Sequence, residues 1–303
     1  MVQRLVLLLL LALPFPGRTA DSALVFLTDF SLRDGAVSAM KGVAHGVDPS
    51  LRQFDLTHEI PPFNIWDGSF RLGQAAPFWP SNSVFVCVVD PGVGTDRLPV
   101  VLRTRSGHAF VGPDNGLFSS VADQLGVDAL HLIDSSRHRL PGSEGSYTFH
   151  GRDLFAHVGA RLASGQITLT EVGPRLTNEP VRIPVPPPNH SGNRCTGVIT
   201  VLDVQFGNVW SNIDPKTLAA LNAQPGDRFR ITIRHHGKQV ARFTAPYVTT
   251  FGEVPEGKPL VYLNSLLQLS IALNQDNLAQ RYRIGSGPDW TLEALLLNRR
   301  PSP

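Results

Sequence analysis

The sequence predicts an α/β fold: an N-terminal doubly wound, mainly parallel sheet, followed by a smaller C-terminal β-barrel-like domain. In the first half of the chain, short apolar runs alternate with helical stretches, which is typical of a parallel sheet covered by helices. In the second half, strand-like runs follow one another with few helices between them. The 303 residues, 42% of them hydrophobic and 17% charged, are enough to build two cores.

Residues 1–22 resemble a secretory signal peptide. Arg4 precedes the apolar run Leu5–Leu13, which is short for a membrane span and is followed by Pro14. An uncleaved anchor and a misassigned start codon are the alternatives. No later segment is long and apolar enough to span a bilayer. We expect a secreted or periplasmic protein if the leader is a true signal peptide, and a cytoplasmic protein otherwise.

The N-terminal α/β domain is expected over residues 23–180, with glycine or proline at the ends of most of its helices. The expected strands are Leu24–Leu27, Leu51–Leu56, the run that starts at Val84, a hairpin of Val100–Arg105 and His108–Val111, and Ala129–Ile133. The expected helices are Gly35–Gly46, Trp66–Ala76, Phe118–Leu125 and a last one that begins near Phe149 and runs through Leu162.

Residues 181–194 are rich in proline, which is typical of a stiff, extended linker. The C-terminal domain is then expected over residues 195–303, and it should be mainly β. Its expected strands are Gly197–Val204, Arg228–His235, Lys238–Phe243 and Leu260–Leu263, with a hairpin turn at His236-Gly237.

Three expected strands run into a carboxylate, at Asp29, Asp90 and Asp203. In open α/β sheets, ligands bind at the carboxyl ends of the strands. The clearest case is the run VFVCVVDPGVG, in which the buried strand stops at Asp90 and a Pro-Gly turn follows. A plain turn is the commonest meaning of one such motif. Its recurrence favours a polyhydroxylated or cationic ligand surrounded by acids.

Asp90, Arg97 and His150 supply an acid, a fixed cation and a titratable base. Such a set can bind and orient a water molecule and draw a proton from it. Taken alone, His150 is equally well explained as a capping or packing residue. These residues do not have the spacing of a zinc site, and neither do Cys87 and Cys195, so no metal is expected. The net charge of +2, without a run of basic residues, argues against nucleic acid as a partner.

In the second domain, Asp203, Phe206, Asn208 and Trp210 gather an acid, two aromatic rings and an amide around a glycine. An amide can bind the edge of a planar base while an aromatic ring stacks on its face. A strand, a turn and a core tryptophan, without any ligand, would explain the same residues. Asn264 and Ser265 are candidates for further polar contacts. The chain has no Walker or GxGxxG phosphate loop, which argues against a nucleotide held by its phosphates.

Six segments in order resemble the S-adenosylmethionine hydrolases (hydroxide adenosyltransferases), relatives of the fluorinase and chlorinase enzymes. They are TDFSLRDG, THEIPPFNIWDGSF, VVDPGVGTDR, FVGPDNGLF, TFHGRD and DVQFGNVWSNID, and they run from about Leu24 to about Gly285. The resemblance implies a homotrimer that binds S-adenosyl-L-methionine between the first domain of one subunit and the barrel of its neighbour. This molecule is then the substrate, and no cofactor is implied.

The resemblance also assigns roles to individual residues. By it, Asp90, Arg97 and His150 are the catalytic trio that activates water. The substrate-binding positions are Asp29 at the ribose, Phe63 over the ribose, Phe149 and Gly151 beside the reacting centre, Asp34 and Asp203 near the methionine end, Phe206, Asn208 and Trp210 on the adenine side, and Ser265 near the carboxylate.

The filled trio favours hydrolysis to adenosine and L-methionine over halogenation, because the halogenating relatives lack this set around their nucleophile. One departure is Leu266-Leu267, where a small residue pair is expected, and this puts the carboxylate contacts in doubt. A non-catalytic adenosine- or S-adenosylmethionine-binding protein is the main alternative, and a halide-using transferase is a third.

Overall fold

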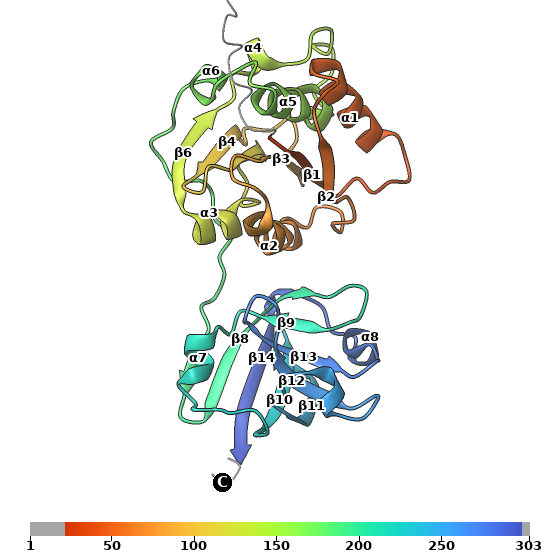
Figure 1. Ribbon diagram of the computed structural model, residues 1–303, viewed down its shortest axis with the longest axis vertical. Coiled ribbons are helices and arrows are strands. Elements are labelled where there is room, and N and C mark those ends of the chain that lie inside the picture. The colour runs from red at the N-terminus through yellow and green to blue at the C-terminus, as the bar shows by residue number, and fades with distance from the viewer. Residues whose placement is uncertain (1–21, 299–303) are drawn as a thin grey trace, which may run out of the picture.

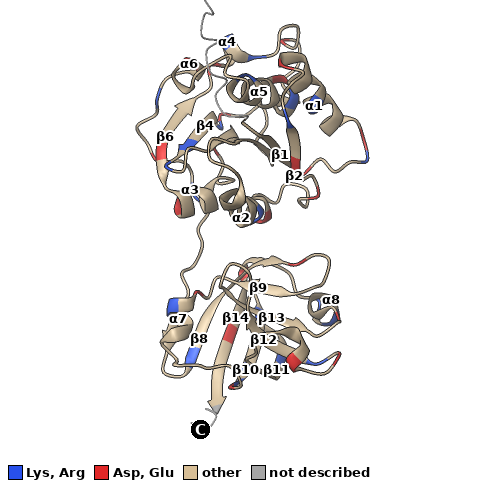
Figure 2. Cartoon of the chain, viewed as in Figure 1, with Lys and Arg blue, Asp and Glu red and all other residues tan. Residues whose placement is uncertain are grey.

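The computed structural model describes residues 22–298, which form two lobes joined by an extended segment (Figure 1). The expected signal peptide lies, except for Ser22, outside the described residues. Within residues 22–298, no helix is long and apolar enough to cross a membrane. In the view of Figure 2, basic and acidic residues are interspersed over both lobes rather than gathered by sign.

The N-terminal lobe contains a six-stranded sheet with the order β2-β1-β3-β5-β4-β6. Strands β2, β1, β3 and β5 are parallel, and β4 runs antiparallel to both of its neighbours. The strands are β1 (Leu24–Thr28), β2 (Gln53–Thr57), β3 (Val84–Val88), β4 (Pro99–Thr104), β5 (Ala109–Pro113) and β6 (Val127–Leu132). Every residue of β1 and β3 is buried, as expected for strands covered on both faces.

Helices cover the two faces of this sheet, which confirms the predicted fold class. Alternate residues of β1 separate the two cores: Val25 and Leu27 belong to one, and Leu24 and Phe26 to the other. The helices are α1 (Ala36–Val47), α2 (Ile65–Ala75), a 3-10 turn η1 (Ala76–Phe78), α3 (Ser119–Leu125), α4 (Ser135–His138), η2 (Gly151–Ala156), α5 (His157–Ala163) and α6 (Leu169–Val172). The helix expected near Phe149 differs in detail, because η2 is a π-helix that continues into α5.

The C-terminal lobe is an antiparallel sheet with the order β11-β10-β14-β8-β9-β13-β12, and β7 pairs with β8. A bridge between Tyr247 and Val261 connects its two ends, so the sheet is nearly closed and the prediction of a barrel-like domain is confirmed. The strands are β7 (Asn189–Ser191), β8 (Arg194–Leu202), β9 (Val209–Ser211), β10 (Arg228–His235), β11 (Lys238–Pro246), β12 (Pro259–Leu263), β13 (Leu269–Leu273) and β14 (Gly287–Asn298). Short helical pieces complete it: α7 (Pro215–Ala219), η3 (Phe251–Glu253) and α8 (Leu278–Tyr282).

The sequence did not predict β7, β9, β13 or β14. Strands of three residues, such as β7 and β9, are too short to show a period. The first residues of β14 are Gly287, Pro288 and Asp289, which are typical of a turn. Because of β7, the proline-rich segment is free of regular structure only up to residue 188.

Helix α2 is where the two lobes touch. The Trp66 indole Nε1 donates to the carbonyl of Thr200 at 2.8 Å, and Arg71 Nη2 donates to that of Leu202 at 2.5 Å. Burial raises the pKa of Asp67 despite the nearby positive charge of Arg71. The hydrogen bonds from Trp66 and Arg71 hold the end of β8 next to the first lobe, and with it Asp203, the next residue in the chain.

Candidate active site

Two neighbouring parallel strands end at one cavity in the N-terminal lobe. Asp29 directly follows β1, and Asp90 lies two residues beyond β3. Because β1 and β3 are hydrogen-bonded in parallel, their carboxyl ends meet at the same edge of the sheet. The cavity has a volume of about 260 Å³. Its lining includes these expected residues: Asp29, Phe63, Asp90, Phe149, His150 and Gly151.

Arg97 connects Asp90 to His150. Its Nε lies 3.0 Å from each oxygen of the Asp90 carboxylate, and its Nη2 lies 2.5 Å from Oδ2. The same Nη2 donates to His150 Nδ1 at 2.8 Å. The Asp90 and Arg97 side chains are only 4% and 9% exposed, so the pair is shielded from water. The three expected catalytic residues therefore form one hydrogen-bonded group.

The bond from Arg97 fixes how the His150 ring carries its proton. A guanidinium group only donates, so Nδ1 must accept and the proton of the neutral ring sits on Nε2. Burial lowers the pKa of His150, and the positive charges of Arg97 and Arg139 lower it further. The neutral ring is the favoured form. Its Nε2 is buried and has no hydrogen-bond partner among the described residues, so this N–H remains unsatisfied.

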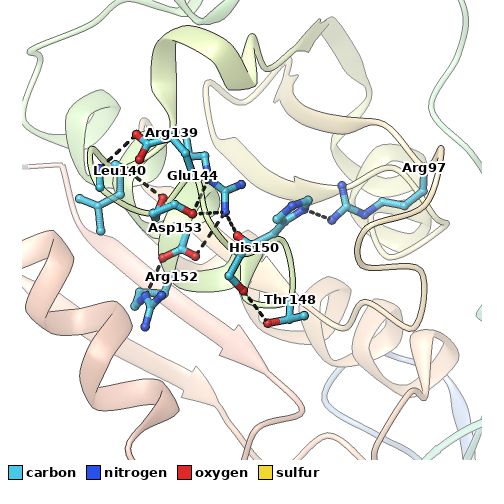
Figure 3. A network of polar contacts seen from close by, with 11 residues as sticks. Arg97, Arg139, Leu140, Glu144, Thr148, His150, Arg152 and Asp153 are labelled. Atoms are coloured by element: carbon cyan, nitrogen blue, oxygen red, sulfur yellow. Dashed lines mark hydrogen bonds and ion pairs between the residues drawn. The ribbon is translucent and has the colours of Figure 1, made fainter.

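A second polar network holds the loop before His150 (Figure 3). The wholly buried Asp153 accepts from Arg152 Nε at 2.6 Å and pairs with Arg139. Arg139 in turn donates to the carbonyl of Ser143 at 3.0 Å and stacks over the Tyr147 ring. Asp153 lies in the π-helix, a local widening that occurs frequently at functional sites. The network thus fixes the backbone on both sides of His150.

Asp29 and Phe63 form another part of the cavity wall. The Phe63 N–H donates to Asp29 Oδ2 at 2.8 Å. Burial raises the pKa of Asp29, partly offset by this bond, and the negative charge of Asp90 adds to the rise. Phe63 has φ 66° and its residue is 70% exposed, an unusual backbone for a bulky side chain. Gly151 is confined, since a Cβ there would lie 3.1 Å from the Phe30 ring.

The C-terminal lobe holds a larger cavity of about 880 Å³. Its lining includes five expected residues: Asp203, Phe206, Asn208, Trp210 and Ser265. The turn after β8 is closed by Asp203, whose N–H donates to the Asn208 carbonyl at 2.9 Å, while Asn208 Nδ2 donates back to Asp203 Oδ2 at 3.1 Å. Gly207 must be a glycine, because it has φ 70° and a Cβ would lie 1.9 Å from Asn277 Oδ1.

Asn264 presents an unused donor in this cavity. Its Oδ1 accepts from the N–H groups of Leu266 and Gln268 at 2.9 and 3.0 Å. Its Nδ2 is buried and has no hydrogen-bond partner among the described residues. Tyr262, Asn274 and Asn277 also line the cavity, and sequence reasoning missed them. The run Asn274-Gln-Asp-Asn277 was the available signal, since amides in a turn between elements often bind ligands.

The two cavities have no lining residue in common. Asp34, expected near the methionine end, lines neither of them. Its Oδ1 accepts from the Ala36 N–H at 2.9 Å, at the start of α1. Among residues 22–298, no three His, Cys, Asp or Glu side chains are grouped so that they could hold a metal ion.

Comparison with known proteins is consistent over both lobes. Residues 24–173 match the family model for the SAM hydroxide adenosyltransferase N-terminal domain, and residues 197–291 match that for the C-terminal domain. An (R)-S-adenosyl-L-methionine hydrolase from Salinispora tropica is 38% identical over 252 residues, which cover 82% of this chain and 89% of the relative. A fluorinase from an Actinoplanes species is 28% identical over 289 residues, covering 87% and 95%. A crystal structure of a conserved protein from Thermotoga maritima superposes with a TM-score of 0.81 at 34% identity, covering 90% of this chain and 99% of that one.

Proposed function

This chain belongs to the SAM hydroxide adenosyltransferase family, and we propose that it hydrolyses S-adenosyl-L-methionine to adenosine and L-methionine. The observation that carries the proposal is the joined group of Asp90, Arg97 and His150 at the edge of a cavity. Asp90 and His150 line this cavity, and Arg97, which is not in the lining, is a buried cation bonded to both of them. A small polar ligand such as a water molecule fits beside this carboxylate and the unpaired N–H.

In this reaction the water oxygen attacks the 5′ carbon of the substrate, and the bond from that carbon to sulfur breaks. The bonding electron pair remains on sulfur, which changes from a sulfonium cation to the neutral thioether of methionine. No acid is needed to protonate this leaving group. The residues therefore act on the water alone, by orienting it in line with the carbon–sulfur bond and stabilising the negative charge that develops on its oxygen.

Asp90 is the member of the trio that we propose takes the proton of the water. Arg97 cannot accept one, and the neutral His150 ring already carries its proton on the free Nε2. His150 then donates a hydrogen bond to the water oxygen, and the Arg97 charge favours the developing hydroxide. General-base help of this kind contributes roughly 10²–10⁴-fold to a rate.

Halogenation is the second candidate, because fluorinases are among the relatives. Two carboxylates, Asp29 and Asp90, line the cavity of the first lobe. Negative groups in the lining of the cavity disfavour a halide anion relative to a neutral water molecule. The hydrolase from Salinispora tropica is also more similar to this chain than the Actinoplanes fluorinase is, at 38% against 28% identity.

We further propose that the complete site forms between copies of this chain in a homotrimer. A cavity of about 260 Å³ is smaller than the roughly 300–1,000 Å³ of sites that enclose such ligands. The expected adenine-side residues line the separate cavity of the second lobe. Joining the first cavity of one copy to the second cavity of its neighbour would supply both halves.

The function is tested by incubating the purified protein with the substrate, with and without chloride or fluoride, and separating the products by chromatography. We expect steady adenosine release that does not depend on halide. His150→Ala removes a hydrogen-bond donor to the developing hydroxide, so it should reduce turnover by about 10²–10³-fold while leaving substrate binding largely intact. Binding without turnover in the wild type would instead support the non-catalytic alternative, and a 5′-halogenated product would support the halogenase.

The composite site is tested by mixing two inactive variants, Arg97→Met and Asp203→Ala, and allowing their subunits to exchange. After random exchange of equal amounts, about three trimers in four are mixed, and each mixed trimer has one site in three with two intact halves, so roughly a quarter of the wild-type activity should return. No recovery, despite subunit exchange shown by mass spectrometry, would mean that each site lies within one chain.

For localisation, we propose export directed by the leader, which rests on Arg4 and the apolar run Leu5–Leu13. N-terminal sequencing of the native protein tests this. A mature chain that starts near residue 21 is expected, and an intact Met1 in a cytoplasmic fraction would contradict it.

A further inference from the structure

A line of four side chains lies behind the Asp29 wall of the first cavity, and the reaction outlined above does not use it. Lys41 on α1 donates to Asp55 Oδ2 at 2.6 Å, and His58 Nε2 bonds Asp55 Oδ1 at 2.9 Å. On its other side, His58 Nδ1 bonds the Thr28 hydroxyl at 2.8 Å. The four residues come from α1, β2, the loop after it and β1, so the line crosses the edge of the sheet.

This arrangement resembles a nucleophile with its base and acid, but it is closed to ligands. Thr28 is 0% exposed, and the His58 side chain is 2% exposed. Neither residue lines the first cavity. No substrate atom can reach the Thr28 hydroxyl, so a second catalytic centre does not explain the line.

What the line does is join two loops that form the cavity wall. Thr28 Oγ1 accepts from the Phe30 N–H at 3.2 Å, and the His58 carbonyl accepts from the Ser31 N–H at 2.7 Å. Asp29 lies between these anchored positions. The chain after His58 leads through residues 59–62 to Phe63, whose N–H binds the Asp29 carboxylate.

We infer that His58 is a positioning residue for the site: its Nδ1 bond to Thr28 holds Asp29 and Phe63 in the geometry that binds the nucleoside part of the substrate. This inference rests on the proposed function for the identity of that substrate. The trio of Asp90, Arg97 and His150 does not contact His58, so the predicted effect is on substrate binding rather than on the chemical step.

Asp55 and Lys41 anchor the outer end of the line. Burial would raise the pKa of Asp55, but the hydrogen bonds from Lys41 and His58 outweigh it and lower the pKa. Asp55 therefore stays ionised and accepts from Nε2, which orients the ring with Nδ1 toward Thr28. Losing the Asp55 bond should matter less than losing the Thr28 bond, because Asp55 acts only through the ring.

The two bonds of His58 can be removed separately. In His58→Asn, the shorter side chain places an amide near the position of Nδ1, so the Thr28 bond can be kept and the Asp55 bond is lost. In His58→Gln, the amide reaches the position of Nε2, so the Asp55 bond can be kept and the Thr28 bond is lost. A role limited to overall stability would not make the two variants differ in substrate affinity.

The experiment measures KM and kcat for adenosine release, and the dissociation constant of adenosine by calorimetry, for the full-length wild type and both variants. We expect His58→Gln to raise KM and the adenosine dissociation constant about tenfold, with kcat within about threefold of wild type. His58→Asn should stay within about threefold in all three. The control is His131→Asn, another buried histidine, whose Nδ1 lies 2.9 Å from the Gly173 carbonyl in a different part of the lobe.

Thermal unfolding of each variant identifies any that fail to fold. Thr28→Val removes the bond between Thr28 and His58 Nδ1 from the threonine side, and we expect the same rise in KM as for His58→Gln. Equal KM values for the Asn and Gln variants, or a fall in kcat alone, would overturn the inference. A wild type that binds adenosine but releases none from the substrate would refute the proposed function instead. The adenosine constants of the variants would still decide the role of His58.

Discussion

The two cavities differ in how their polar groups are satisfied. In the N-terminal lobe, Asp90, Arg97 and His150 bond to one another and leave one N–H unused. In the C-terminal lobe, the cavity is larger, and Asn264 holds its loop with Oδ1 while Nδ2 remains unpaired. The first arrangement is suited to placing one small reactant, and the second to recognising a larger ligand by shape and hydrogen bonds.

The strongest test of this contrast is Arg97→Met. Removing the cation leaves the Asp90 carboxylate buried without its partner, which typically costs about 3–5 kcal/mol of stability. Because Arg97 stabilises the developing hydroxide, adenosine release should fall by about 10²–10³-fold. Chemical denaturation and product chromatography measure the two effects. The double variant Asp90→Asn with Arg97→Met should recover part of the stability and none of the activity, and recovered activity would show that the pair is only structural.

The pH dependence of kcat tests the electrostatics of the same cavity. Because burial and the neighbouring arginines lower the pKa of His150, the ring stays neutral below the ordinary histidine pKa of about 6.5. We therefore expect kcat to remain level as the pH falls through 6.5 and to decline only at lower pH, by up to about tenfold per pH unit. A decline centred at or above 6.5 would contradict the lowered pKa.

Asn264→Asp tests the second cavity. The change keeps the Oδ1 acceptor that fixes the loop and removes the unpaired Nδ2 donor. A lost hydrogen bond of this kind should weaken substrate binding by about tenfold, seen as a higher KM with little change in kcat. Asn193→Asp is a control in the same lobe, since its side chain bonds only the Leu296 carbonyl. A fall in kcat with constant KM would contradict the assignment of substrate recognition to this cavity.

The smallest expected effect is that of Leu267→Gly. Leu267 is 59% exposed and has φ 61°, a backbone that costs an L-residue roughly 1–2 kcal/mol. Glycine removes this cost, but its greater conformational entropy in the unfolded chain lowers the stability by about 0.5–1 kcal/mol. The free energy of unfolding should therefore rise by up to about 1.5 kcal/mol. Denaturant titration measures it, and a loss of stability would indicate a contact of the Leu267 side chain.

Sequence reasoning was most successful where local pattern and burial agree. The buried runs of β1 and β3 and the carboxylates that follow them could be predicted, because such strands and their ends have recognisable composition. Strand β14 could not, since its start looks like a turn and its paired residues in β10 and β8 lie about 55–100 residues earlier in the chain. The His58 line also escaped prediction, because a histidine in a loop does not indicate which hydroxyl it will meet. Asp34 was assigned by resemblance, and its hydrogen bond at the start of α1 is a contact that the motif alone does not show.

The placement of the two cysteines has a practical consequence. Cys87 and Cys195 are the only ones in the chain, and both are unpaired and wholly buried. Burial raises the pKa of both thiols, that of Cys195 to about 12. Since only the thiolate reacts readily with alkylating reagents, the folded chain should be inert to them. A cysteine introduced at the exposed Leu32 would then be the single site for a fluorescent label, and its rate of labelling would report whether another copy of the chain covers this loop.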